Sequence, residues 1–131
     1  MVVTCLLNES TRHLIGAPQF ARMKSSAYLI NVARGPIVDE PALIEALKSG
    51  RIAGAATDVF EQEPVDPANP LLAMDNVIVT PHSLCWTDEC FHNMASTGLA
   101  SIVDALAGRR PEFVVNPDVL AHPRVRGWTP R

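Results

Sequence analysis

The sequence predicts an α/β fold: a partial Rossmann-like parallel sheet with flanking helices. Three observations support this prediction. Short apolar runs rich in β-branched residues alternate with helical patterns along the first 110 residues. The segments that connect them are short, which is typical of strand–helix–strand units. The chain has 131 residues, 47% hydrophobic and 19% charged, as expected for one globular domain or a part of one.

The first half of the chain predicts two strands, each followed by a helix. Val2–Leu7 is an apolar run that predicts a buried strand almost at the first residue. Pro18 suits the first turn of a short helix over Gln19–Met23. Ala27–Val32 is the second strand, and Asp39 caps the helix that follows it. A buried parallel strand needs neighbours on both sides, so we expect this chain to be part of a larger domain.

The second half predicts two more strands and a long helix. Ala53–Val59 is a strand of mostly small residues, and Val77–Thr80 is the fourth strand. Thr87 or Asp88 begins a long helix, which Gly108 ends. Four prolines and little periodicity after this helix predict an extended tail.

The charge balance and the cysteines exclude several classes of protein. Eleven basic and fourteen acidic residues give a net charge of −3, which argues against nucleic acid as a partner. No apolar stretch approaches the roughly 18 residues of a membrane span, and the first residues lack the basic region of a signal peptide. We therefore expect a cytoplasmic protein in which Cys5, Cys85 and Cys90 are reduced thiols. Cys85, Cys90 and His92 lie close in sequence but lack a fourth ligand, so no metal site is predicted.

Four polar side chains follow predicted strands, at the ends where ligands bind in parallel sheets. Arg34 follows the second strand, Asp58 ends the third, Glu63 lies on the next loop and His82 follows the fourth. An arginine fork matches a carboxylate, and a histidine exchanges protons near neutral pH. Together they predict a site for an anionic substrate that needs proton transfer, although each alone also fits a loop or turn residue. The remaining histidines, His13, His92 and His122, receive no role.

Six segments carry motifs that extend this interpretation. They are Leu29–Glu40, Gly54–Pro64, Asn76–His82, Glu9–Gly16, Gly108–Pro111 and Val115–Pro117. In their order along the chain they resemble segments of the D-isomer-specific 2-hydroxyacid dehydrogenases, and several long motifs are more specific than a lone glycine pattern. The resemblance covers nearly the whole chain. It implies that residues 1–110 are the C-terminal half of the NAD-binding domain and that residues 111–131 are a tail returning to the substrate domain.

The resemblance also implies roles for single residues. The family interconverts 2-oxo acids and D-2-hydroxy acids with NAD or, alternatively, NADP. Arg34 would bind the substrate carboxylate, His82 would protonate the carbonyl oxygen, and Glu63 would hold His82 in its protonated form. The residues implied to contact the cofactor are Cys5, Thr11, Val32, Ala33, Arg34, Asp58 and His82. The implied partners are a small 2-oxo or 2-hydroxy acid and, in the full-length protein, a second copy in a homodimer.

Two departures from the family bear on the cofactor and on the pocket. It has no Gly-x-Gly-x-x-Gly turn to seat a pyrophosphate on a helix N-terminus, and its seven glycines are scattered. Leu84 and Cys85 stand where many members have two glycines, which alters the expected pocket wall. Three hypotheses follow: a fragment of a dehydrogenase with a glyoxylate- or hydroxypyruvate-like substrate, a catalytically inactive truncated remnant, and an NAD-sensing binding module of the same fold.

Overall fold

The computed structural model describes residues 1–129. Contacts within the chain divide it into two compact units, Met1–Leu84 and Cys85–Arg131. The boundary that the sequence predicts after residue 110 has a different meaning, because the family resemblance would make it the border between the NAD-binding domain and a tail. That boundary stays a prediction.

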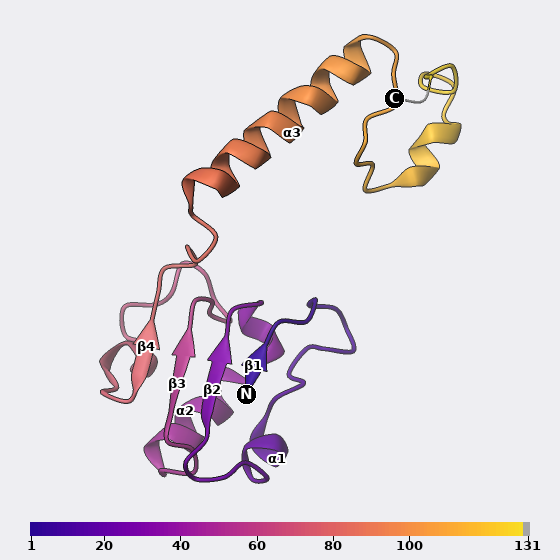
Figure 1. The fold of residues 1–131 in the computed structure, drawn as a ribbon. Coiled ribbons are helices and arrows are strands. Elements are labelled where there is room, and N and C mark those ends of the chain that lie inside the picture. Colours follow the sequence, from indigo (N-terminus) through magenta and orange to yellow (C-terminus); the bar gives the residue numbers. More distant parts are fainter. Residues whose placement is uncertain (130–131) are drawn as a thin grey trace. The chain divides into compact units, whose positions relative to one another are not determined.

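The first unit is built on a four-stranded parallel sheet in the order β1-β2-β3-β4 (Figure 1). The strands are β1 (Val2–Val3), β2 (Tyr28–Asn31), β3 (Gly54–Thr57) and β4 (Val77–Val79). In register, Leu29 lies beside Ala55, and Ala55 lies beside Val77. All four carboxyl ends therefore meet at one edge of the sheet, and the predicted α/β class is confirmed.

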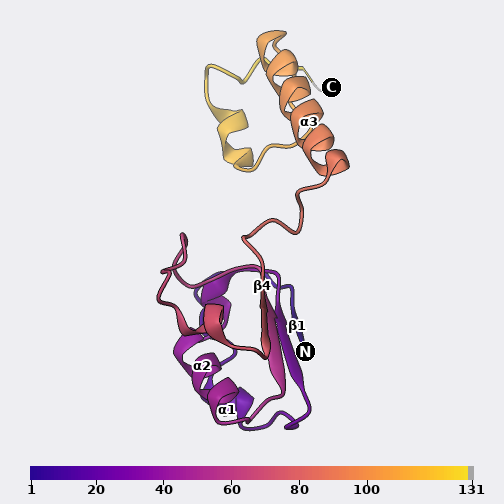
Figure 2. The ribbon, with the colours of Figure 1, turned by 90° about the vertical axis from the view of Figure 1, so that its left-hand side faces the viewer.

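Two helices cover one face of this sheet, α1 (Ala17–Phe20) and α2 (Glu40–Lys48) (Figure 2). Their buried side chains pack against the strands in a single core that includes Phe20, Leu29, Leu43, Leu47 and Ala55. On the opposite face, Tyr28 and Ile78 are 59% and 68% exposed. The flanking helices α1 and α2 of residues 1–84 thus lie on one side of the sheet.

The ends of α2 follow from local chemistry. The Asp39 carboxylate accepts a hydrogen bond from the N–H of Ala42 at 3.0 Å, as its position before the helix predicts. Lys48 lies in the last turn, where a positive charge is favourable. Gly50 follows with a φ of 66°, a left-handed conformation that glycine adopts without steric cost.

The first strand is shorter than the sequence predicts. The apolar run Val2–Leu7 forms a strand only over Val2–Val3. Its neighbour β2 ends at Asn31, and the next inter-strand hydrogen bond, from the N–H of Val32 to the carbonyl of Val3, is already 3.4 Å long. Apolar composition alone cannot place this end, because it is set by the length of the partner strand.

The long helix of the second unit is α3 (Asp88–Leu106). The Thr87 hydroxyl accepts a hydrogen bond from the N–H of Cys90 at 3.2 Å, and the rings of Trp86 and Phe91 lie 6.2 Å apart across the first turn. Gly108 follows the helix with a φ of 68°, as predicted for its end. None of the helices in the described part of the chain is both long enough and apolar enough to cross a membrane.

The tail is less extended than its prolines predict. It contains a 3-10 helix over Pro117–Ala121, and a parallel bridge joins Arg109 to Thr129. Proline at the start of the helix is compatible with this turn, because the first helical N–H groups need no intrahelical partner.

Candidate active site

His82 follows β4 with a φ of 53°, a left-handed conformation that is uncommon for residues other than glycine. The Asp58 carboxylate binds the chain on both sides of it. The Thr80 hydroxyl donates to Oδ1 at 2.5 Å, and the N–H groups of Ser83 and Leu84 donate to Oδ1 and Oδ2 at 3.0 and 3.2 Å. Burial acts to raise the pKa of Asp58, but these hydrogen bonds and the nearby His82 lower it below its usual value. Asp58 is therefore an ionised anchor for the His82 turn.

Glu63 contacts the imidazole of His82. Its Oε2 lies 2.7 Å from Nδ1 of His82, and its Oε1 accepts a hydrogen bond from the N–H of Phe60 at 3.0 Å. Burial acts to raise the pKa of Glu63, whereas these two hydrogen bonds and the charges of His82 and Arg34 lower it below its usual value. An ionised Glu63 can only accept, so Nδ1 carries the hydrogen and Nε2 is left to exchange a proton.

Arg34 lies on the turn after β2. The buried side chain of Asn31 fixes this turn, since its Oδ1 accepts from the N–H of Ala33 and its Nδ2 donates to the carbonyl of Arg34, both at 3.1 Å. The next residue, Gly35, packs directly on the backbone of Phe60. The turn that carries Arg34 is thus in contact with the loop that leads to Glu63.

The predicted site residues line two cavities at the carboxyl ends of the strands. One cavity, of about 470 Å³, is lined by Asp58, Glu63 and His82 together with Phe60 and three residues of the neighbouring loops. The other, of about 490 Å³, is lined by residues that follow β1 and β2, including Cys5, Val32, Ala33 and Arg34.

Thr11 lines neither cavity. Its hydroxyl donates to the carbonyl of Leu6 at 2.7 Å and accepts from the N–H of Asn8 at 2.8 Å. These bonds close the turn after β1, so the described contacts of Thr11 are structural. Its role toward a cofactor stays a prediction.

The cavity after β1 and β2 is suited to one end of a dinucleotide. Its lining combines backbone with apolar side chains such as Leu6, Leu7 and Val32, and Arg34 is the charged residue among them. Such a wall fits an uncharged flat ring better than it fits a pyrophosphate, which requires a cluster of N–H donors or cations. The residues present therefore fit the nicotinamide end.

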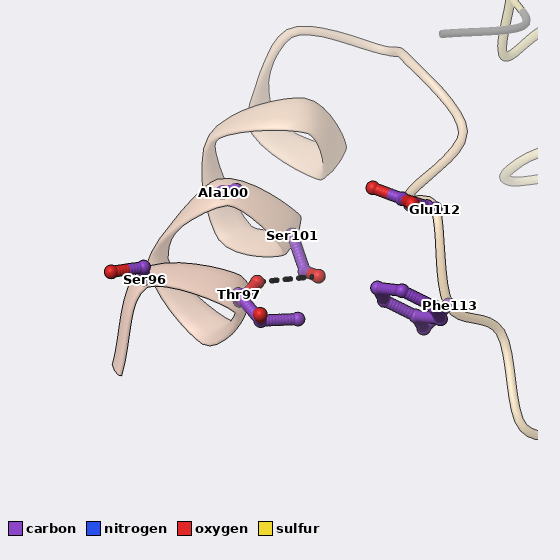
Figure 3. Close-up of a pocket in the computed structure, with 6 residues that line it drawn as sticks. All are labelled: Ser96, Thr97, Ala100, Ser101, Glu112 and Phe113. Carbon is purple, nitrogen blue, oxygen red and sulfur yellow. Dashed lines mark hydrogen bonds between the residues drawn. The ribbon is translucent and has the colours of Figure 1, made fainter. Parts of the chain in front are cut away.

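A third cavity, of about 210 Å³, lies in the second unit between α3 and the segment after it (Figure 3). Its lining residues are Ser96, Thr97, Ala100, Ser101, Glu112 and Phe113. The Ser101 hydroxyl is already bonded to the carbonyl of Thr97 at 2.9 Å. None of the residues that the sequence predicts for the site lines this cavity.

The cysteines are free thiols in the structure. Within residues 1–129, no group of three or more His, Cys, Asp or Glu side chains is arranged to hold a metal ion.

One contact involves residues to which the sequence analysis gives no role. Nε2 of His13 lies 2.6 Å from Oε1 of Glu61, and Glu61 also exchanges hydrogen bonds with Glu40. His13 and Glu61 lie within two of the segments that resemble the dehydrogenase family. Their place in these segments is the sequence signal that could have pointed to His13 and Glu61.

Comparison with known proteins gives a consistent result. Residues 1–83 match the family model described as D-isomer specific 2-hydroxyacid dehydrogenase, NAD binding domain. The chain is 52% identical over 113 residues to glyoxylate/hydroxypyruvate reductase B of Citrobacter koseri, a match that covers 86% of this chain and 35% of that protein. The chain thus spans about a third of the length of this curated relative.

Solved structures agree with this match. D-lactate dehydrogenase with NAD+ from Lactobacillus jensenii has a TM-score of 0.82 at 42% identity, covering 88% of this chain and 38% of that one. A D-isomer specific 2-hydroxyacid dehydrogenase from Xanthobacter autotrophicus Py2, in complex with NADPH and MES, has a TM-score of 0.73 at 42% identity, covering 97% and 49%. Since the family model matches more than half of its residues, this chain belongs to the D-isomer specific 2-hydroxyacid dehydrogenases, through their NAD-binding domain.

Proposed function

We propose that this chain is the proton-transfer part of an oxidoreductase that interconverts a 2-oxo acid and a D-2-hydroxy acid with NAD or NADP. The observation that carries the proposal is the 2.7 Å contact between Nδ1 of His82 and Oε2 of Glu63, beside a cavity at the carboxyl ends of β3 and β4. The named activity of the Citrobacter koseri reductase supports a glyoxylate- or hydroxypyruvate-like substrate.

Each residue has a separate task in this reaction. A bound nicotinamide dinucleotide would supply the hydride that reduces the carbonyl carbon. His82 donates a proton from Nε2 to the carbonyl oxygen, and the ionised Glu63 stabilises the imidazolium and fixes its tautomer. The guanidinium of Arg34 binds the substrate carboxylate, for which its planar fork is suited. The product is the 2-hydroxy acid, and the reverse reaction returns the proton to His82.

The cofactor would be held at its nicotinamide end by the cavity after β1 and β2. Cys5, Val32, Ala33 and Arg34 line this cavity. Asp58 lines the other cavity, where it would act by holding His82 in place. The seven glycines form no Gly-x-Gly-x-x-Gly turn, so the pyrophosphate would be bound by parts of a longer protein. The family resemblance supports a homodimer of that protein, and the free cysteines are compatible with a reducing cytoplasm.

The test is a chimaera in which this chain replaces the matching segment of the Citrobacter koseri reductase. Turnover of glyoxylate and hydroxypyruvate is followed by the absorbance of reduced nicotinamide. We expect activity in the chimaera and a loss of about 10²- to 10⁴-fold in turnover on His82→Ala, with cofactor affinity little changed. His92→Ala, an exposed histidine on α3, is the matched control.

Two results would contradict the proposal. If His82→Ala and His92→Ala turn over equally fast, His82 is not the proton donor. If the chimaera folds but reduces neither substrate, the chain is better explained as an inactive remnant, or as a nucleotide-sensing module when the cofactor still binds.

A further inference from the structure

The first unit contains a second histidine–carboxylate contact. Nε2 of His13 and Oε1 of Glu61 are 2.6 Å apart, which requires a hydrogen between them, so His13 donates from Nε2. The backbone places this imidazole. His13 has a φ of 50°, and its N–H donates to the carbonyl of Pro36 at 2.8 Å. A left-handed histidine costs energy and persists only where its surroundings fix it.

Glu61 is joined to the first turn of α2 by a reciprocal pair of hydrogen bonds. The N–H of Glu40 donates to Oε1 of Glu61 at 3.2 Å, and the N–H of Glu61 donates to Oε2 of Glu40 at 3.0 Å. The side chain of Asn69 donates to the other oxygen of Glu40 at 2.6 Å. His13 supplies a second donor to Oε1 of Glu61, the oxygen that also accepts from the N–H of Glu40.

These contacts hold the backbone that orients Glu63. Phe60 and Glu61 pass Gly35 so closely that a Cβ at Gly35 would lie 1.9 Å from the carbonyl carbon of Phe60. The N–H of Phe60 donates to one oxygen of Glu63, and His82 binds the other. A shift of the backbone at Phe60 and Glu61 would therefore turn the Glu63 carboxylate away from His82.

We propose that His13 and Glu61 are positioning residues for the Glu63–His82 pair. Their contact keeps the turn from Phe60 to Glu63 in the one orientation that hydrogen-bonds both oxygens of Glu63. Neither residue touches a reacting atom. The effect on catalysis rests on the function proposed above, whereas the effect on Glu63 does not.

The test is a carbon-13 NMR titration of the Glu63 carboxyl group in the 131-residue chain. His13→Leu removes the donor, and we expect the pKa of Glu63 to rise toward its ordinary value as its hydrogen bonds loosen. His13→Gln keeps an N–H group near the position of Nε2 but cannot carry a charge, and we expect it to restore the low value. His92→Leu is the matched control and should leave Glu63 unchanged.

Two results would overturn the proposal. One is a pKa of Glu63 that is the same in His13→Leu as in the unsubstituted chain. The other is an equal rise in both His13 variants, because loss of charge would then explain the change without any role for the donor.

Glu61→Ala decides the question if His13→Leu does not fold. Removing a neighbouring negative charge alone would lower the pKa of Glu63, whereas a loss of positioning would raise it. A rise supports the proposal, and a fall or no change contradicts it. No substrate or cofactor is present in this titration, so its outcome is independent of whether the chimaera is active.

Discussion

The substitution Gly35→Ala tests how tightly the turn after β2 is packed on the Phe60–Glu61 backbone. An added Cβ would lie 1.9 Å from the carbonyl carbon and oxygen of Phe60 and 2.4 Å from the nitrogen of Glu61. Carbon atoms in contact are about 3.5 Å apart, so the two backbone segments would have to separate by roughly 1.5 Å. Neither segment moves freely, because Glu61 is bonded to Glu40 and the neighbouring Ile37 is fully buried.

We expect Gly35→Ala to lower the free energy of unfolding by about 3 kcal/mol, the upper part of the range for overpacking. With a urea slope of about 1–2 kcal/mol per M, the unfolding midpoint falls by roughly 2 M. The assay is urea denaturation followed by backbone amide NMR signals of β2 and β3. Such signals report on the first unit separately from α3.

Gly98→Ala is the matched control. Gly98 lies within α3, and an added Cβ there meets nothing within 4 Å. We expect the free energy of unfolding that the amide signals of α3 report to rise by about 0.5–1 kcal/mol, because alanine is a better helix former than glycine. If Gly35→Ala unfolds at the same urea concentration as the unsubstituted chain, the inference that Gly35 packs tightly on the Phe60–Glu61 backbone is wrong.

Two further predictions concern the site. The pKa of Asp58 is lower in the folded state than its ordinary value of 3.8. Its ionised form therefore stabilises the fold above about pH 3.8, and this stability is lost as the pH falls through the pKa of the folded state. Asp58→Asn should therefore cost about 1–3 kcal/mol at pH 7 and little at low pH, as urea midpoints would measure; an equal cost at both would contradict the ionised anchor. In the chimaera, Arg34→Lys should raise the KM for the 2-oxo acid about tenfold or more, since lysine lacks the planar fork. An unchanged KM would mean that another group binds the carboxylate.

Local chemistry explains which parts of the fold the sequence could predict. Asp39 caps α2 and Gly108 follows α3 because each acts on backbone groups within its own turn. The end of β1 depends instead on where β2 stops, more than 25 residues away, and no local pattern contains that information. Local sequence also does not show that α1 and α2 cover the same face of the sheet, because this depends on how the whole unit packs.

The site shows the same division. Glu63 and His82 belong to motifs, and the structure brings them together at 2.7 Å. The contact between His13 and Glu61 joins residues 48 positions apart, and a lone histidine in a polar segment carries no periodic signal. Only the folded chain brings the two residues together.

Asp58 shows why a residue's place at a strand end does not define its task. A left-handed conformation costs His82 of order 1–3 kcal/mol, and hydrogen bonds to a charged group contribute about 1.5–3 kcal/mol each. The three hydrogen bonds from Thr80, Ser83 and Leu84 to Asp58 are therefore sufficient to hold His82 in this conformation. The resemblance predicts a cofactor contact for Asp58, and these bonds give it an additional task. A carboxylate that is already engaged on both oxygens has little capacity left for a ligand, so its larger effect should be on the placement of His82.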